Sequence, residues 1–204
     1  YIMLDRQRFQ QAGFIPPEIP NFPFGFQYGD AMWVTEQPGS YYRRHLLLHE
    51  GTHWFMQRQF GSAGPPWFME GMAEWLGTHR WDGEQLEMGI IPADKQDVPF
   101  WGRITLIQQQ LLSGNSPSLE TVLRYDGTAH QRVDAYAWSW AAVVFLQNHP
   151  ETKRTFELLL QQPMRDDQSM TRWLFARLRA RWPELRQEWN AFLTDLEYGY
   201  DPAR

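Results

Sequence analysis

Short apolar runs separated by turn residues dominate the start of the chain. Residues 24–28 and 31–35 are two such runs on either side of Gly29-Asp30, which is the pattern of a β-hairpin. Residues 1–4 have the composition of a further short strand, and residues 6–12 that of a short helix. We therefore expect a small sheet in the first part of the chain.

From residue 41 onward, apolar positions recur at helical spacing. The pattern predicts a helix over residues 41–60 with Ser40 as its N-cap, then a Gly- and Pro-rich break, and a second helix over residues 67–80. A loop-rich stretch over residues 81–99 follows. The remaining expected helices cover residues 100–112, 118–124, 130–148, 151–161, 169–181 and 183–198.

Strands followed by helices are typical of an α+β domain. A chain of 204 residues suits one domain over residues 1–204, with the strands and the first two long helices in 1–99 and a helical subdomain in 100–204. Hydrophobic residues make up 43% of the chain and 11 residues are Trp, so there is enough apolar surface for a folded core.

Composition excludes several classes of function. A net charge of −5 offers no basic surface for nucleic acid or an anionic membrane. The absence of Cys excludes disulfides, cysteine-ligated zinc and thiol nucleophiles. The longest apolar run, residues 137–146, is shorter than the roughly 18 residues that a membrane span needs. The chain begins at Tyr1 without an initiator methionine, which suggests a processed product.

The predicted helix over residues 41–60 contains a His-Glu-x-x-His motif at residues 49–53. His49 and His53 are four residues apart and lie on one helix face, so both imidazoles can point at one tetrahedral ion. Glu50 projects from an adjacent part of that face. Two nitrogen ligands beside a carboxylate are the arrangement of a zinc hydrolase. The alternative is an amphipathic helix with surface histidines.

Such a site needs a third protein ligand, and Glu70 is the candidate. It lies 17 residues after His53 on the next predicted helix. The short Gly- and Pro-rich connection turns the chain back, so the two helices can pack side by side. Gly51 and Gly71 lack side chains and would let the backbones approach closely. Glu70 can then offer its carboxylate to the same ion.

Glu74 follows Glu70 by one turn, on the same helix face. It is placed to accept a hydrogen bond from the outer ring nitrogen of a ligand histidine, for which we choose His49. A solvated acidic face is the alternative for both carboxylates, since Glu is mostly exposed. Residues 67–76 are strongly apolar, however, and carboxylates in such a segment are expected to be paired or bound to a metal.

Together these residues resemble the gluzincin metallopeptidases. The His-Glu-x-x-His motif, followed by Trp67-Phe68-x-Glu70-Gly71-x-Ala73-Glu74, is similar to the peptidase-like domain of a poorly characterised group of bacterial gluzincins. The resemblance covers about residues 46–77. The metzincin variant is excluded, because it requires Gly at position 56 and His at position 59, where this chain has Met56 and Gln59.

The resemblance implies a zincin-like fold that hydrolyses a peptide or protein substrate. It implies Zn²⁺ ligands at His49, His53 and Glu70, with Glu74 as a supporting carboxylate. Glu50 would act as the general base that takes a proton from water and passes it to the leaving amine. An extracytoplasmic location is expected from the resemblance and from the start of the chain.

The oxyanion of such a reaction needs a further hydrogen-bond donor. In gluzincins a downstream Tyr or His often provides it, and Tyr136 is the first candidate here, with His130 as the second. A core tyrosine is the alternative for Tyr136. His45, one turn before His49, is expected to be solvated. Residues 31–35 are expected to form the edge of the sheet, on which a peptide substrate could lie extended. The alternative is an edge strand that binds no ligand.

Three functions remain open at this point. The first is a zinc-dependent peptidase. The second is a binding or scaffold module on the same fold, without proteolysis. The third is a helical interaction protein without a metal, in which the motif is accidental. Metal analysis separates the third function from the others, and digestion of peptides with and without a chelator separates the first two.

Overall fold

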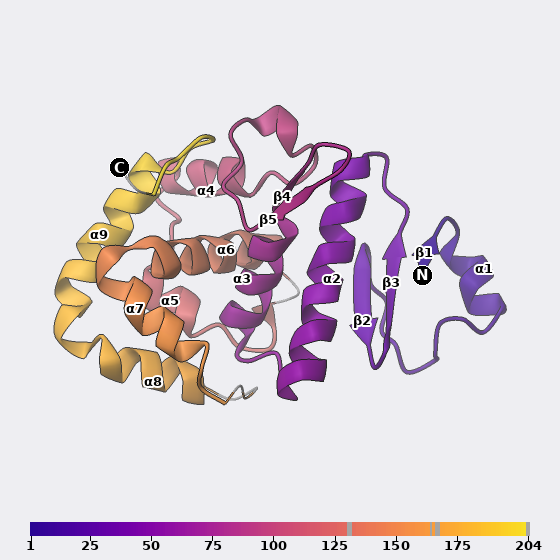
Figure 1. Cartoon of the computed structure of the whole chain (residues 1–204), viewed down its shortest axis with the longest axis horizontal. Helices are drawn as coiled ribbons and strands as arrows, with labels where there is room; N and C mark the ends of the chain where they lie inside the picture. Colours follow the sequence, from indigo (N-terminus) through magenta and orange to yellow (C-terminus); the bar gives the residue numbers. More distant parts are fainter. Residues whose placement is uncertain (130–131, 164, 166–167, 203–204) are drawn as a thin grey trace.

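The computed structural model describes residues 1–129, 132–163, 165 and 168–202. A small sheet lies at one end of the molecule, and the long helix α2 runs alongside it (Figure 1). Most of the other helices pack on the far side of α2. The strands all precede residue 89 within the described residues, and helices fill the second half. This confirms the expected α+β class.

Strands β1 (Ile2–Met3), β2 (Gly25–Tyr28) and β3 (Ala31–Thr35) form one sheet in the order β1-β3-β2. The hairpin of β2 and β3 is antiparallel, as expected, whereas β1 pairs with β3 in parallel. Because β3 is paired on both sides, the expectation that residues 31–35 form a sheet edge is wrong. The edge strand of the hairpin is β2.

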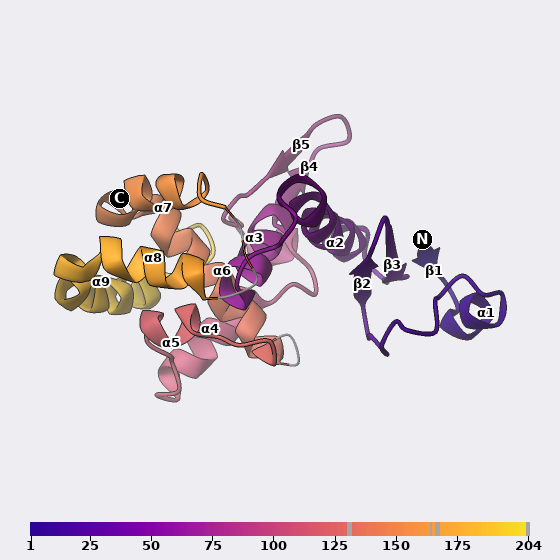
Figure 2. The same ribbon diagram turned by 90° about the horizontal axis from the view of Figure 1, so that it is seen from below.

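The outer side of the sheet has a small core of its own, which α1 (Arg6–Gln11) and the loop after it cover (Figure 2). Asp5 caps α1 by accepting a hydrogen bond from the backbone N–H of Arg8. The buried residues of this outer core are Met3, Ile15, Ile19, Phe22 and Trp33. They are separate from the main core, so the sheet lies between a minor apolar cluster and α2.

Helices α2 (Ser40–Phe60) and α3 (Pro66–Gly77) lie side by side in both Figure 1 and Figure 2. The N-cap of α2 is Gly39 and makes no side-chain hydrogen bond, so the expected capping role of Ser40 is wrong. The helix ends at Gly61, whose φ of 74° is in the left-handed region that favours glycine. Pro at the first position of α3 needs no N–H partner, which suits a helix start.

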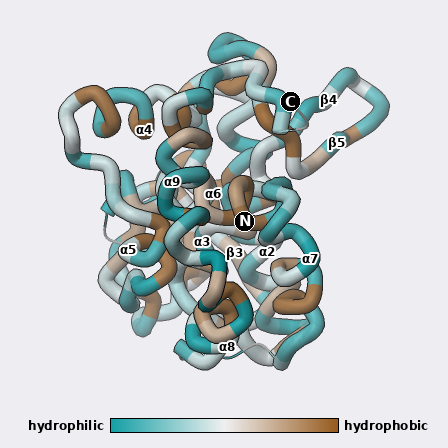
Figure 3. The backbone as a smooth tube through the Cα atoms, turned by 90° about the vertical axis from the view of Figure 1, so that its left-hand side faces the viewer, coloured by the Kyte–Doolittle hydropathy of each residue, from teal (hydrophilic) through white to brown (hydrophobic). Residues whose placement is uncertain are grey.

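Helix α3 stops before the expected residue 80, because a hairpin follows directly. The hydroxyl of Thr78 donates to the carbonyl of Glu74 at 2.8 Å and closes the last turn. The chain then forms β4 (His79–Trp81), which pairs antiparallel with β5 (Leu86–Met88). Figure 3 shows this hairpin projecting from the rest of the chain. Most of its residues are exposed, so its apolar pattern is weak and sequence reasoning predicted only a loop.

Glycines let α3 approach both of its helical neighbours. A Cβ atom on Gly71 would lie 2.5 Å from the backbone oxygen of Ser139 in α6, so Gly71 serves that contact rather than the one with α2. The contact with α2 uses Gly77, where a Cβ atom would lie 2.9 Å from the ring of His45. Gly51 has no comparable role, since its nearest neighbour would be 4.0 Å away.

The second half of the chain is helical, and α6 (Val133–Asn148) lies at its centre with residues buried on all sides. It packs against α3, which connects α2 to the main core. Helix α4 begins three residues later than expected, because Gly102 precedes it with a φ of 60°. The other helices are α4 (Arg103–Leu112), α5 (Leu119–Leu123), α7 (Pro150–Leu159), α8 (Ser169–Arg177) and α9 (Trp182–Asp195).

Candidate metal centre

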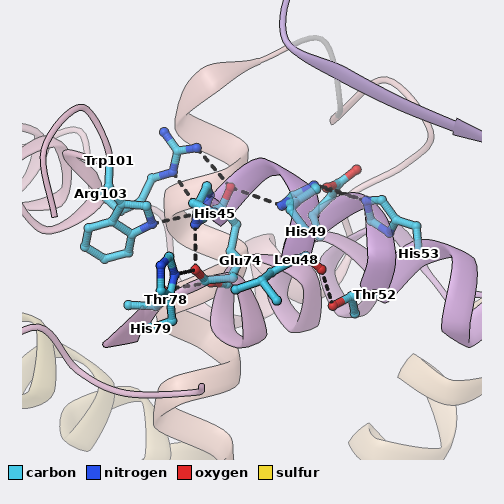
Figure 4. Close-up of polar contacts among 12 residues, drawn as sticks. His45, Leu48, His49, Thr52, His53, Glu74, Thr78, His79, Trp101 and Arg103 are labelled. Carbon is cyan, nitrogen blue, oxygen red and sulfur yellow. Dashed lines mark hydrogen bonds and ion pairs between the residues drawn. The ribbon is translucent and has the colours of Figure 1, made fainter. Parts of the chain in front are cut away.

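Successive turns of α2 carry the two motif histidines next to each other (Figure 4). The Nε2 atoms of His49 and His53 lie 3.1 Å apart. From α3, Oε2 of Glu70 lies 3.2 Å from Nε2 of His49 and 3.5 Å from Nε2 of His53. Three possible ligand atoms from two helices therefore converge on one point.

The spacing of these atoms fits a tetrahedral metal ion. Ligands about 2.0–2.1 Å from zinc are separated by about 3.3 Å along the edges of a tetrahedron. The three measured separations are 3.1, 3.2 and 3.5 Å. Oε2 of Glu70 is buried and accepts no hydrogen bond within the described residues. Since a buried acceptor without a partner costs free energy, a cation at this point would stabilise the cluster.

The charges of the cluster depend on one another. Burial by itself would raise the pKa of Glu70, but the neighbouring imidazoles of His53 and His49 lower it to about 2. Burial by itself would lower the pKa of His49, but the adjacent carboxylate of Glu70, with smaller contributions from two other glutamates, raises it to about 9. In the metal-free protein His49 therefore holds a proton at neutral pH. A metal ion has to displace that proton, because only the neutral imidazole is a ligand.

Glu50 lies beside the ligand group without belonging to it. Its side chain is buried, and burial raises its pKa against the lowering effect of His49 and His53. A Cβ atom on Gly25 of β2 would come within 2.5 Å of Oε1 of Glu50. Glycine at position 25 therefore leaves room for the carboxylate, and the sheet holds Glu50 in place by close approach. No local signal in the sequence marks Gly25 for this role.

Glu74 is the most fully paired carboxylate near the centre (Figure 4). Its Oε2 accepts from Nε1 of Trp101 at 3.1 Å and from Nε of Arg103 at 3.0 Å, and its Oε1 accepts from Nη2 of Arg103 at 2.9 Å. Nδ1 of His49 lies 3.5 Å from Oε1, close to the contact expected from the sequence but longer than a good hydrogen bond. Against the effect of burial, Arg103 and then His45 hold the pKa of Glu74 well below its usual range.

His45 is buried, with 1% of its surface exposed, so the expectation that it is solvated is wrong. It lies one turn before His49 on the face of α2 that packs against α3. Its Nδ1 is 3.0 Å from the carbonyl oxygen of Gly77, and its Nε2 is 3.6 Å from Oε2 of Glu74. The neighbouring Arg43 and Arg44 are only half-buried, so the polar character of the segment misled the prediction for His45.

His45, His49 and Glu74 form a second group whose ligand atoms are close enough to hold a metal. The carboxylate of that group, however, already has the guanidinium of Arg103 against both oxygens. A divalent ion there would meet a fixed positive charge at a distance where repulsion is strong. Around Glu70, no Lys or Arg is paired with the carboxylate among the described residues, so this group is the better candidate for a metal site.

Tyr136 lies in the first turn of α6, next to the centre. Its ring centroid is 6.0 Å from that of His49 and 5.8 Å from Cζ of Arg103. Burial, and then the charge of Glu70, raise its pKa far above the usual value. Its hydroxyl therefore keeps its proton and can act as a hydrogen-bond donor. His130, the other candidate, lies outside the described residues.

A cavity of about 360 Å³ opens beside the cluster, and His49, Glu50 and Tyr136 line it. Its volume is within the range of small-molecule sites. Larger cavities of about 660 and 880 Å³ lie elsewhere, but none of the three ligand residues lines them. Arg103 also lines the cavity at the cluster. Sequence reasoning missed Arg103 and Trp101, since each is more than 25 residues from Glu74 and belongs to no motif.

No family model, curated protein or solved structure matches the chain. The function of the protein has to be inferred from its residues and their geometry. Among the helices in the described part of the chain, none is both long and apolar enough to cross a membrane.

Proposed function

We propose that this protein is a zinc-dependent metallopeptidase of the gluzincin type. The observation that carries the proposal is the convergence of two imidazoles and one buried carboxylate, with a second buried carboxylate, Glu50, beside them. His49, His53 and Glu70 would hold the ion. Two histidines and one glutamate are the ligand set of several zinc peptidases, and they leave one coordination position for water or substrate.

Bound zinc would supply a Lewis acid that polarises the scissile carbonyl and lowers the pKa of water. The protein's own part begins with Glu50. Its carboxylate lines the cavity, and burial raises its pKa, which makes it a better proton acceptor than an exposed carboxylate. Glu50 would accept the proton of the attacking water and deliver it to the leaving amine. Gly25 leaves room for that carboxylate against the sheet.

Tyr136 would act as a donor to the oxyanion. Its hydroxyl keeps its proton at neutral pH, and its ring lies beside that of His49 in the same cavity. A donor held in place before the reaction stabilises developing charge more than one that has to reorient. The charge of Arg103 is largely used by Glu74, so we assign it to positioning rather than to the oxyanion.

The substrate would be a peptide in an extended conformation. Among the described residues β2 pairs only with β3, so its other edge has unpaired backbone groups. Gly25 of β2 lies directly against Glu50. A peptide that adds to this edge as a further strand would run past the general base, a recurring mode of peptide recognition. The free edge of β2, rather than β3, is thus the proposed platform for the peptide.

The experiment is a digestion of a broad peptide library with and without a chelator, together with elemental analysis of the purified protein. We expect about one zinc per chain, and cleavage that the chelator abolishes. Glu50→Gln should retain the metal and lower the rate by about 10²–10⁴-fold. Glu157→Gln, at an exposed carboxylate far from the centre, is the matched control and should cleave normally.

Other results would redirect the proposal. Stoichiometric metal without any cleavage, over a broad library, would support a binding or scaffold module instead. Iron in place of zinc would point to oxidative chemistry, because two histidines and one carboxylate also form the iron site of some oxygenases. Full activity of Glu50→Gln would refute the assigned base.

A further inference from the structure

Phe100 combines two features that cost free energy. Its φ is +70°, and it is the one non-glycine residue with a positive φ among the described residues. Its side chain is 65% exposed, although it is a large aromatic. A left-handed conformation is unfavourable for a residue with a Cβ atom, and it persists only where the surroundings enforce it. Such residues often occur at functional sites.

The turn that contains Phe100 favours glycine at this position. The backbone N–H of Trp101 donates to the carbonyl of Val98 at 3.2 Å, with Pro99 and Phe100 between them. A proline at the second position and a positive φ at the third are the features of a type II turn. Glycine or asparagine usually occupies the third position, because that position needs a positive φ. Phe100 therefore contradicts the local preference of its own turn.

The tertiary structure holds the turn on both sides. Trp101 is buried and donates a hydrogen bond to Glu74. Gly102 then leads into α4, and Arg103, the first residue of that helix, donates to the same carboxylate. The ring of Phe100 lies against Gly39, where a Cβ atom would be only 3.3 Å from it. Phe100 is thus fixed at one place, and most of its ring remains uncovered.

That place is the cavity of the metal centre. Phe100 lines it together with Phe24 and Val133, which are 46% and 62% exposed. The three residues come from the segment before β2, the turn before α4 and the start of α6. Exposed apolar side chains from separate segments that gather on one cavity mark a binding surface. His49 and Glu50 line the same cavity, so whatever binds there lies next to the reacting groups.

We propose that Phe100 determines specificity, by selecting peptides with a bulky apolar side chain next to the scissile bond. This inference rests on the proposed peptidase function and names its substrate class. The ring of Phe100, with Phe24 and Val133, forms an apolar surface on which such a side chain loses contact with water. A charged side chain would lose hydration there without gaining a partner. The strain at Phe100 is the cost of keeping that ring in the cavity.

The test compares peptides that differ only in the residue on one side of the scissile bond, with Phe, Leu, Ala, Asp or Lys there, and then on the other side. For the unaltered protein, kcat/KM should favour Phe or Leu over Asp by on the order of 10–100-fold on one of the two sides. Phe100→Gly and Phe100→Ala should each reduce that preference by about tenfold, while Phe100→Leu retains it. Phe60→Ala, at an exposed ring that does not line the cavity, should change nothing.

Thermal unfolding separates the backbone strain of the turn from the role of the Phe100 ring, and peptide affinity gives a readout that a purely structural role would not change. Glycine is ordinarily worse than alanine for stability, but it is the residue that this turn favours, so Phe100→Gly should melt no lower than Phe100→Ala. Peptide affinity for the Glu50→Gln protein, measured by calorimetry, should show the same preference for apolar residues and lose it when Phe100→Gly is added.

Each outcome has a clear meaning. Chelator-sensitive cleavage with no apolar preference, or a preference that Phe100→Gly leaves intact, would overturn the inference and leave the peptidase proposal standing. A loss of activity on all peptides alike, accompanied by a large fall in melting temperature of Phe100→Gly, would assign Phe100 a structural role. Absence of any metal-dependent cleavage would refute the peptidase proposal and the inference with it.

Discussion

Glu70 and Glu74 occupy successive turns of α3 and are both buried, yet their surroundings differ. Glu74 has a permanent cation, Arg103, on both of its oxygens and an indole N–H on one. Glu70 faces only two imidazoles, whose charge depends on pH and on metal, and its Oε2 accepts no hydrogen bond within the described residues. Because the fold already satisfies Glu74, we assign it a structural role, and because Glu70 lacks a permanent cation, it is the proposed metal ligand.

The largest expected effect comes from removing the permanent cation. Arg103→Ala would leave the buried carboxylate of Glu74 without its charged partner, which typically costs about 3–5 kcal/mol of unfolding free energy. The loss should be the same with and without metal, as measured by urea unfolding of both forms. Adding Glu74→Gln to Arg103→Ala should recover part of the lost unfolding free energy, since the uncompensated charge is gone.

The control is Arg154→Ala, at an exposed ion pair, which should cost less than about 1 kcal/mol. A metal-dependent loss in Arg103→Ala would contradict the division between the two carboxylates.

Removing the ligand carboxylate should have the opposite signature. Glu70→Gln is expected to abolish the stabilisation of the protein by zinc. The metal-free protein should lose only the pairing of Glu70 with His49, which is worth about 2–3 kcal/mol near neutral pH and disappears as the pH rises to about 9. The stabilisation by zinc should be about 2.7 kcal/mol for the unaltered protein when free zinc is at 100 times its dissociation constant. Melting curves with and without zinc measure it directly. If zinc still raised the melting temperature of Glu70→Gln by the full amount, the ion would be bound elsewhere, and the group around Glu74 would be the first place to look.

The stability of the metal-free protein should depend on pH through the same pair. The pKa of His49 is raised to about 9, above its unfolded value, so its contribution is present below about pH 6.5 and is lost as the pH rises to about 9. The pKa of Glu70 is lowered to about 2, so its contribution is present above about pH 4.5 and is lost as the pH falls toward 2.

Between pH 6.5 and 9 the metal-free protein should therefore lose on the order of 2–3 kcal/mol. Zinc affinity should increase over the same interval, because the proton that competes for His49 is leaving. Unfolding and zinc titrations at several pH values check both trends. His49→Gln should remove both, whereas His149→Gln, at a distant histidine, should preserve them. Equal slopes in His49→Gln and the unaltered protein would exclude His49 as the titrating group.

The smallest expected effect separates the donors to Glu74. Trp101→Phe keeps the buried ring and removes one hydrogen bond, at a cost of about 1 kcal/mol. Arg103 still satisfies both oxygens, so zinc binding should change little. Differential scanning calorimetry and zinc titration test this. A large loss of zinc affinity would show that the position of Glu74, through its 3.5 Å contact with Nδ1 of His49, has more influence on the metal centre than its own pairing suggests.

The sequence by itself predicted the parts of the site that lie within single helices. His49 and His53 share a face because they are four residues apart, and Glu70 and Glu74 share one for the same reason. The hairpin of β2 and β3 was also expected, with nearly the same boundaries, because its turn residues are local signals. Each of these features depends on residues close together in the chain, so the covalent structure and the helical period are sufficient to predict them.

The tertiary structure decided the rest. Arg103 and Trp101 contact Glu74 from 29 and 27 residues away in the sequence. The carboxylate of Glu50 in α2 lies against Gly25, which belongs to the sheet. The burial of His45 and the central place of β3 in the sheet follow from how whole elements pack, and no local pattern encodes that. The α-helical period thus determined which groups face one another along α2 and α3. Packing determined which of those groups already have a partner, because a partner can come from any element that the fold brings alongside.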